Sequence, residues 1–300
     1  MKTNHLRQTV FPILAAMIWG MAFVAQSVSA ELVPPFAFNA SRFFVGFLFL
    51  IGFCFLRRKT GAVEAGKGSA YRKDLAIAGT CCGVALAVAS FLQQKGLETT
   101  TSGKAGFITA LYIVIVPIFG IALKKKAPRT VWLGVVLAVA GLYCLCIKEG
   151  FTIAVGDFYV FLCAICFSCH ILVIDHFSQK VDGVELSCAQ FLVAGILSAL
   201  GAAAVETPTV AGLVACVLPI LYVGIFSSGV AYTLQILAQK DSNPTVVSLL
   251  LSLESVFATI AGALVLHDTM SGREYLGCVL MLAAVMLAQL PDKAEKVNVK

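Results

Sequence analysis

The stretch LVPPFAFNASRFFVGFLFLIGFCFL, residues 32–56, contains one charged residue, Arg42. A helix needs about 20 mostly apolar residues to cross about 30 Å of hydrocarbon, whereas buried helices of soluble proteins have shorter apolar runs. The stretch therefore predicts a transmembrane helix, with one cation inside the membrane.

Similar runs recur along the whole chain. Of its 300 residues, 59% are hydrophobic and only 13% are charged, whereas about 25% are charged in typical soluble domains. Charged residues bound ten long runs: 8–30, 32–56, 75–94, 105–123, 130–147, 158–174, 186–205, 207–239, 242–267 and 275–291. The sequence thus predicts an all-α integral membrane protein with ten transmembrane helices, with the lipid bilayer as its surroundings.

Lys and Arg residues set the expected orientation. If the N-terminus is cytoplasmic, the outer loops contain only Lys95, Lys104, Lys148 and Arg273, and the inner segments contain all other Lys and Arg residues outside the spans. This asymmetry predicts that both termini are cytoplasmic, in the inner membrane of a bacterium. The net charge of +6 then faces the anionic cytoplasmic leaflet, so no nucleic-acid partner is expected.

A cleaved signal peptide is the alternative interpretation of the N-terminus. Lys2 and Arg7 precede an apolar run that ends in the small residues Val28, Ser29 and Ala30. The run is longer than the apolar region of a signal peptide, and its removal would leave nine spans. We therefore expect it to be retained as the first helix. The soluble segments are too short to form an extramembrane domain.

Two segments of the chain repeat one another. Arg42-Phe43-Phe44-Val45 follows Trp19 at the same interval at which Gln190-Phe191-Leu192-Val193 follows Phe167. This predicts two five-helix repeats, residues 1–148 and 149–291, followed by a cytoplasmic tail at 292–300. Because five is odd, the repeats would have inverted topology, a construction of secondary transporters that bind substrate near the bilayer midplane.

Several short motifs resemble the EamA-type members of the drug/metabolite transporter superfamily. They are Trp19-Gly20, Arg42, Leu111-Tyr112 with Val116-Pro117, and the ninth-helix segment 253–258, LESVFA. The resemblance covers about residues 11–290 and implies a ten-helix metabolite exporter with a central cavity and peripheral fifth and tenth helices. Ser255 stands where the family usually has a proline after the glutamate, which would alter a kink in the ninth helix. The basic segment 124–126, between the fourth and fifth helices, suggests a subgroup of the family.

Two charges lie inside predicted spans, Arg42 and Glu254. An unpaired charge at the membrane centre costs at least about 2.5–3.5 kcal/mol, so such residues are usually functional or paired. Counting about 1.5 Å per residue places both at similar depths. They are expected either to form a structural ion pair or to face the cavity, where Arg42 would meet an anionic group and Glu254 an ammonium group or a coupling proton. Snorkelling to the interface is a third interpretation.

Uncharged polar residues in the central spans extend the candidate site. Trp19 and Phe23 lie one helical turn apart, as do Tyr232 and Gln235, so each pair shares a helix face. About a third of the polar set is expected to contact substrate; the set is Gln26, Gln93, Gln94, Tyr112, Ser227, Ser228, Tyr232 and Gln235. The residues assigned to substrate binding or coupling are Arg42, Glu254, Trp19, Tyr112, Gln94, Tyr232, Gln235 and Ser228.

The 11 cysteines do not indicate a metal site. Cys163, Cys166, Cys169 and His170 suggest a cluster, but steps of three residues rotate about 60° around a helix and spread these side chains apart. The sequence also lacks a phosphate-binding glycine loop and the zinc-protease and serine-nucleophile motifs. We therefore expect no metal, no cofactor and no enzymatic activity.

Three functions remain open from the sequence. The first is a secondary exporter of a small polar metabolite, working by alternating access and coupled to protons through Glu254. The second is a passive facilitator of the same substrates. The third is a membrane-embedded enzyme or receptor, which would need polar residues clustered at one membrane face. One cation and one anion in the cavity favour a zwitterion, so an amino acid or related compound is the expected substrate.

Overall fold

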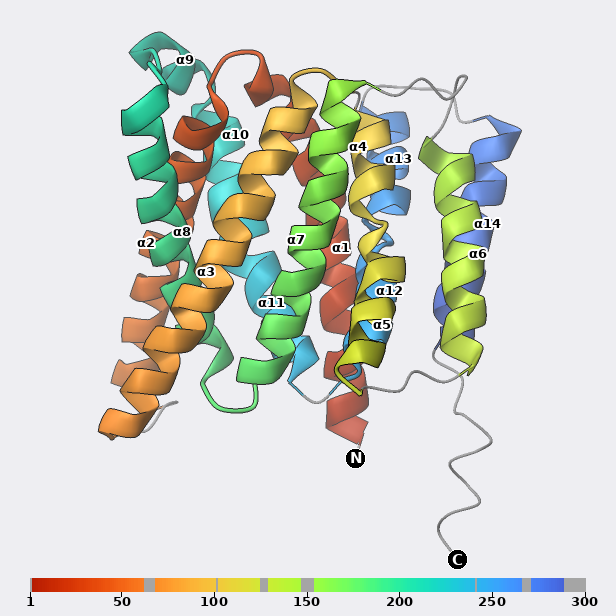
Figure 1. Cartoon of the computed structure of the whole chain (residues 1–300), viewed down its shortest axis with the longest axis horizontal. Helices are drawn as coiled ribbons and strands as arrows, with labels where there is room; N and C mark the ends of the chain where they lie inside the picture. Colours follow the sequence, from red (N-terminus) through yellow and green to blue (C-terminus); the bar gives the residue numbers. More distant parts are fainter. Residues whose placement is uncertain are drawn as a thin grey trace, which may run out of the picture.

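A computed structural model of the chain describes residues 2–61, 68–100, 102–124, 129–146, 154–240, 242–265 and 271–288. Within these ranges, every regular element is a helix, and the long helices run roughly side by side (Figure 1). The tail expected at 292–300 lies outside the described residues, as do Lys125 and Lys126 of the basic segment.

The helices of the first half are α1 (Lys2–Ala30), α2 (Pro35–Lys59), α3 (Ser69–Leu97), α4 (Ser102–Thr109), α5 (Tyr112–Ala122) and α6 (Arg129–Cys146). Those of the second half are α7 (Val155–Phe177), α8 (Gly183–Val205), α9 (Val210–Ala215), α10 (Val217–Tyr222), the π-helix η1 (Val223–Tyr232), α11 (Thr233–Gln239), α12 (Pro244–Leu251), α13 (Glu254–Val265) and α14 (Gly272–Ala288). Some of these elements join end to end into longer rods, as α10, η1 and α11 do.

In the described part of the chain, 8 helical segments are long and apolar enough to cross a membrane. They are Arg7–Ala30, Pro35–Lys59, Ser69–Leu97, Lys104–Ala122, Val155–Phe177, Gly183–Val205, Val217–Gln239 and Pro244–Ala261. The apolar stretch of α6, Arg129–Leu145, is shorter, and α14 has 17 residues. Large apolar side chains such as Phe55, Val136 and Met286 are more than half exposed, as expected where lipid covers the protein. The chain is thus an all-α, multi-pass membrane protein.

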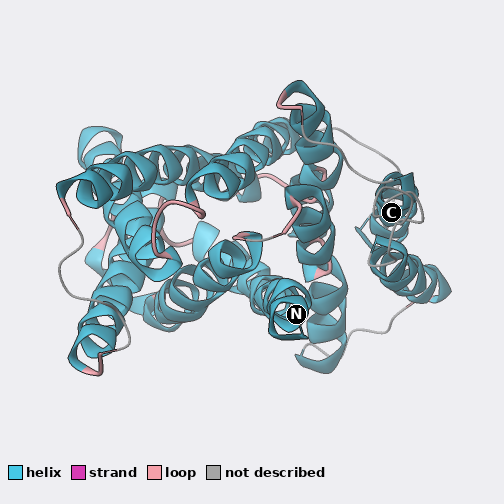
Figure 2. Cartoon of the chain, turned by 90° about the horizontal axis from the view of Figure 1, so that it is seen from below, coloured by secondary structure: helices cyan, strands magenta, loops and turns pink. Residues whose placement is uncertain are grey.

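Most helices surround a common centre. α1 packs against η1, α11, α12 and α13, whereas α3 packs against α7 and α8. α6 and α14 pack chiefly against each other at one side of the molecule (Figures 1 and 2). Polar side chains directed toward the centre are therefore remote from the outer helix pair.

Two of the membrane-spanning segments are interrupted near mid-height (Figure 1). Between α4 and α5, the amides of Leu111 and Ile113 bond to carbonyls three residues back, and between α12 and α13 the amides of Leu253 and Ser255 do the same. Such tight turns interrupt the regular ladder of i to i−4 hydrogen bonds. The second interruption exists although residue 255 is serine and not proline, so the helix is broken there without a proline.

Candidate functional site

A cavity lies between the central helices and contains about 510 Å³ of space not filled by atoms, counting its open mouth. Its walls come from both halves of the chain. The lining residues are Trp19, Ala22, Phe23, Gln26, Arg42, Gln93, Thr109, Tyr112, Phe167, His170, Ile171, Ser227, Tyr232, Gln235, Leu251 and Glu254. Half of these residues are polar or charged and the other half are aromatic or aliphatic, and apolar walls that carry placed polar groups are typical of a small-molecule site.

The two helix interruptions place polar side chains in this cavity. Tyr112 is the first residue of α5 and Glu254 is the first residue of α13. The Tyr112 hydroxyl donates a hydrogen bond of 3.1 Å to Glu254 Oε1, and both side chains are almost fully buried. Because Glu254 lies in the first turn of α13, the helix dipole favours its negative charge.

Gly20 on α1 allows α13 to approach closely at Glu254. A Cβ atom on Gly20 would lie 2.6 Å from the carbonyl oxygen of Glu254 and 2.7 Å from the amide nitrogen of Ala258. Both distances are shorter than any real Cβ contact, so only glycine fits here without movement of the backbone. The Trp19-Gly20 motif therefore has a packing role next to the cavity carboxylate.

Arg42 lies inside the protein and is 2% exposed. Its Nη1 donates to Gln26 Oε1 at 3.2 Å, and its guanidinium carbon lies 4.7 Å from the centre of the Phe43 ring. Its Nε has no hydrogen-bond partner among the described residues. Arg42 and Glu254 line the same cavity, but no ion pair joins them in the described chain. The structural ion pair between Arg42 and Glu254, which both lie in the described ranges, is thus absent, and both side chains line the cavity.

Aromatic side chains form one side of the cavity. The Trp19 indole donates to the Ser227 carbonyl oxygen at 3.3 Å, and its ring meets Tyr232 edge to face at 4.8 Å between centroids. Ser227 and Tyr232 belong to the π-helix η1. π-helical turns are frequently found at functional sites, and here the turn brings Ser227 and Tyr232 to the cavity.

Six of the eight residues assigned from the sequence line the cavity: Arg42, Glu254, Trp19, Tyr112, Tyr232 and Gln235. Gln94 and Ser228 do not. Gln94 Nε2 donates to the backbone oxygen of Gln26 at 3.0 Å, so it links α3 to α1 behind the wall. Ser228 is fully buried and packs against Gly46 of α2, where an added Cβ atom would lie 3.0 Å from the Ser228 Cβ. Their helix faces, which the sequence alone does not fix, direct both side chains away from the cavity.

Other lining residues were absent from that assignment. Gln26, Gln93 and Ser227 belong to the wider polar set, whereas Thr109 and His170 lie outside it. The sequence pattern draws attention to His170 only as a possible metal ligand, yet its ring lines the cavity, and its Nε2 lies 2.9 Å from Gln190 Oε1. Its depth within an apolar span was the signal that could have identified it, because a buried histidine in a membrane is costly.

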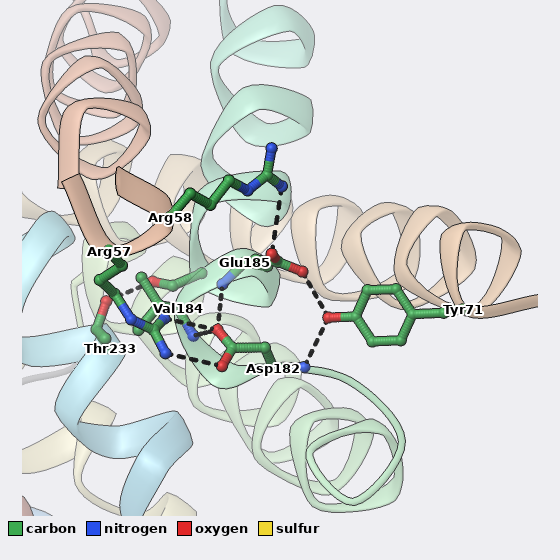
Figure 3. Close-up of polar contacts among 8 residues, drawn as sticks. Arg57, Arg58, Tyr71, Asp182, Val184, Glu185 and Thr233 are labelled. Atoms are coloured by element: carbon green, nitrogen blue, oxygen red, sulfur yellow. Dashed lines mark hydrogen bonds and ion pairs between the residues drawn. The ribbon is translucent and has the colours of Figure 1, made fainter. Parts of the chain in front are cut away.

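A second polar cluster joins α2, α3 and α8 at the membrane end that carries the N-terminus (Figure 3). Arg57 forms a bidentate ion pair with Asp182, at 2.9 and 3.1 Å. Tyr71 donates to Glu185 at 2.6 Å and accepts from the Asp182 amide at 2.9 Å. At the opposite end of the same helix pair, the Glu206 carboxylate accepts from the amides of Phe36 and Ala37, each at 2.8 Å. α2 and α8 are thus tied together at both ends.

Comparison with known proteins gives a consistent result. The EamA-like transporter family model matches residues 9–147 and again residues 154–290. An uncharacterized transporter of Archaeoglobus fulgidus is 33% identical over 282 residues, covering 92% of this chain and 84% of that protein. The uncharacterized transporter YoaV of Bacillus subtilis is 20% identical, covering 95% and 97% of the two chains. A solved crystal structure of a protein that is 19% identical matches with a TM-score of 0.77, and the match covers 96% of this chain and 98% of that protein. At this identity the match shows a shared fold alone.

Proposed function

Because the chain belongs to the EamA-like transporter family of the drug/metabolite transporter superfamily, we propose that it exports a small polar metabolite, an amino acid or related compound. It is a multi-pass membrane transporter, and the proposal adds substrate class, direction and mechanism. The observation that carries it is that Arg42 and Glu254 line one buried cavity without pairing with each other.

The proposed topology has ten transmembrane helices in two inverted repeats, residues 1–148 and 149–291. α6 and α14 supply the two spans beyond the longer segments. Helix packing supports this division. In it, α1, α2 and α3 of the first repeat correspond to α7, α8 and the α10–η1–α11 rod of the second. The third helix of each repeat then packs on the first helix of the other, α3 on α7 and the rod on α1. Likewise, α5 packs on α7 as α13 packs on α1. The proposed location is the inner membrane of a bacterium, and the Lys and Arg distribution supports a cytoplasmic position for both termini.

The charges of the cavity favour a zwitterionic substrate. Arg42 has a free Nε donor and a planar guanidinium group that suits a carboxylate. Glu254 accepts one hydrogen bond, from Tyr112, and its second carboxylate oxygen receives none from the described chain. A substrate with both a carboxylate and an ammonium group would pair with both residues and neutralise two buried charges.

Glu254 is also the proposed coupling group. It starts a broken helix, the arrangement that secondary transporters use at their binding sites. In alternating access, one half rocks against the other, and Glu254 would bind a proton from outside in exchange for the substrate ammonium released there. Tyr112 would hold the carboxylate in place between these steps.

The proposal is tested by profiling metabolites in the medium of bacterial cells that express the wild type or Glu254→Gln at matched membrane levels. One compound class should accumulate outside only with the wild type. Indistinguishable media would contradict export of a cellular metabolite. Export that follows the substrate gradient and persists after collapse of the pH gradient would instead indicate a passive facilitator.

A further inference from the structure

Gln235 has an amide orientation that is fixed by a chain of hydrogen bonds. The backbone oxygen of Ile171 can only accept, so Gln239 donates its Nε2 to it, at 2.8 Å. Gln239 consequently presents Oε1 to Gln235, whose Nε2 donates at 3.0 Å. The remaining polar atom, Gln235 Oε1, is buried and receives no hydrogen bond from the described chain. Gln235 thus has an acceptor that cannot be exchanged for its donor by rotation of the amide.

His170 supplies a second acceptor in the same cavity. The ring is fully buried and meets Tyr232 edge to face at 5.9 Å. Its Nε2 lies 2.9 Å from Gln190 Oε1; with the Gln190 amide oriented in this way, Nε2 carries the proton. Nδ1 is then an acceptor, and no described residue donates to it.

The Gln235 acceptor lies toward the membrane end that carries the N-terminus. Gln235 is within one turn of the end of α11, which lies in the lower half of Figure 1. Arg42, with its unpaired Nε donor, lies within two turns of the opposite end, where α2 begins at Pro35. The unpaired donor of Arg42 and the unpaired acceptor of Gln235 therefore lie toward opposite ends of the cavity.

A buried acceptor without a donor is unfavourable, so such atoms in a binding cavity indicate what the ligand supplies. We propose that Gln235 Oε1 and His170 Nδ1 form a hydrogen-bond-accepting subsite for an N–H or O–H group on the substrate side chain. The inference rests on the proposed function and narrows it. The substrates are amino acids or relatives whose side chain carries a hydroxyl, amide or amine, with the carboxylate at Arg42 and the side chain directed toward the cytoplasm.

The chain contains a built-in reporter for this test. It has 2 tryptophans, of which Trp19 lines the cavity and Trp132 lies in the peripheral α6. In purified Trp132→Phe protein, Trp19 fluorescence is titrated with L-threonine and L-valine, which differ by a hydroxyl in place of a methyl group. L-glutamine and L-glutamate form a second pair, because the side-chain amide of glutamine can donate a hydrogen bond whereas the carboxylate of glutamate only accepts. We expect the donor-bearing member of each pair to bind at least about tenfold more tightly.

Variants assign the preference to the two acceptors. Gln235→Met keeps the length of the side chain and should lower the threonine-to-valine ratio, because it removes one of the two acceptors. His170→Gln, which can replace Nε2 but not Nδ1, should weaken the preference, whereas His170→Asn, which offers an acceptor near Nδ1, should retain it. Gln179→Met, at an exposed position outside the cavity, is the matched control and should keep the wild-type ratio.

Each contrary result has a distinct meaning. Equal binding of threonine and valine by the wild type, or an unchanged ratio in both Gln235→Met and His170→Gln, overturns the subsite but leaves an amino-acid transporter. If no amino acid changes the fluorescence of Trp19 and radiolabelled L-threonine does not bind, the amino-acid assignment and the subsite fail together.

Discussion

Tyr112 and Glu254 begin the second halves of two broken helices and are hydrogen-bonded to each other at 3.1 Å. They are 142 positions apart in the sequence and come from opposite halves of the chain. The contact joins the two interruptions at the cavity, so the carboxylate and the phenol act as one unit at the place where the halves meet.

The first prediction concerns this pair. Glu254→Gln should abolish uphill export, because a neutral amide does not exchange a proton, while the protein still reaches the membrane. Tyr112→Phe should lower export by about tenfold, the effect of losing a hydrogen bond to a charged group. Both are measured as the ratio of outside to inside substrate at matched expression. Normal uphill export by Glu254→Gln would remove the coupling role.

The second prediction concerns Gly20. Gly20→Ala should destabilise the protein by about 1–3 kcal/mol, because the new methyl group would overlap the backbone of α13 at Glu254. Thermal unfolding in detergent measures this. Gly52→Ala in α2 is the matched control, because a Cβ there meets nothing within 4 Å, and it should be neutral or slightly stabilising. Equal melting temperatures for the two variants would contradict the close approach of α1 and α13.

The third prediction concerns Arg42. Since Arg42 and Glu254 form no ion pair, the charge-reversed double variant, Arg42→Glu with Glu254→Arg, should not restore export lost in the single variants. Arg42→Lys should retain part of the activity and raise the KM, because an ammonium group cannot contact a carboxylate in a bidentate manner. Rescue by the double variant would instead indicate a structural ion pair.

The fourth prediction concerns the link between α2 and α8 in Figure 3. The side chains of Arg57 and Asp182 are only 22% and 21% exposed and meet with two hydrogen bonds, so a double-mutant cycle with alanine should give a coupling energy of about 1 kcal/mol. Arg58 and Glu185 provide the comparison. The Arg58 side chain is 65% exposed, so its coupling should be smaller and more sensitive to salt. A larger coupling for this exposed pair would contradict the assignment.

The fifth prediction concerns topology. Alkaline phosphatase fused after Lys300 should be inactive, and a fluorescent protein at the same position should fluoresce, because the C-terminus is expected in the cytoplasm. A phosphatase fusion after Lys148, in an expected outer loop, should be active. An active fusion after Lys300 would contradict the cytoplasmic C-terminus, and an inactive fusion after Lys148 would contradict the odd number of spans expected before that residue.

The sequence alone determined the all-helical membrane class and singled out the two charged residues that line the cavity, Arg42 and Glu254. The prediction from composition and charge spacing rests on the free energy of transferring each side chain into lipid. This quantity belongs to the single residue and its neighbours in the sequence, so an all-helical membrane protein can be predicted without any tertiary contact. The cost of a buried charge identified Arg42 and Glu254 for the same reason. The family resemblance was confirmed by the match over both halves of the chain.

Only the tertiary structure decided which polar residues meet. Gln94 and Ser228 have the same local character as Gln93 and Ser227, yet only the latter two line the cavity, because a step of one residue turns a side chain about 100° around a helix. His170, and the hydrogen-bond chain that orients Gln235, depend on how α7, α8 and α11 pack. Periodicity gives each helix its faces, but the partner of each face is set by contacts between segments far apart in the sequence, and these decide which side chains reach the cavity.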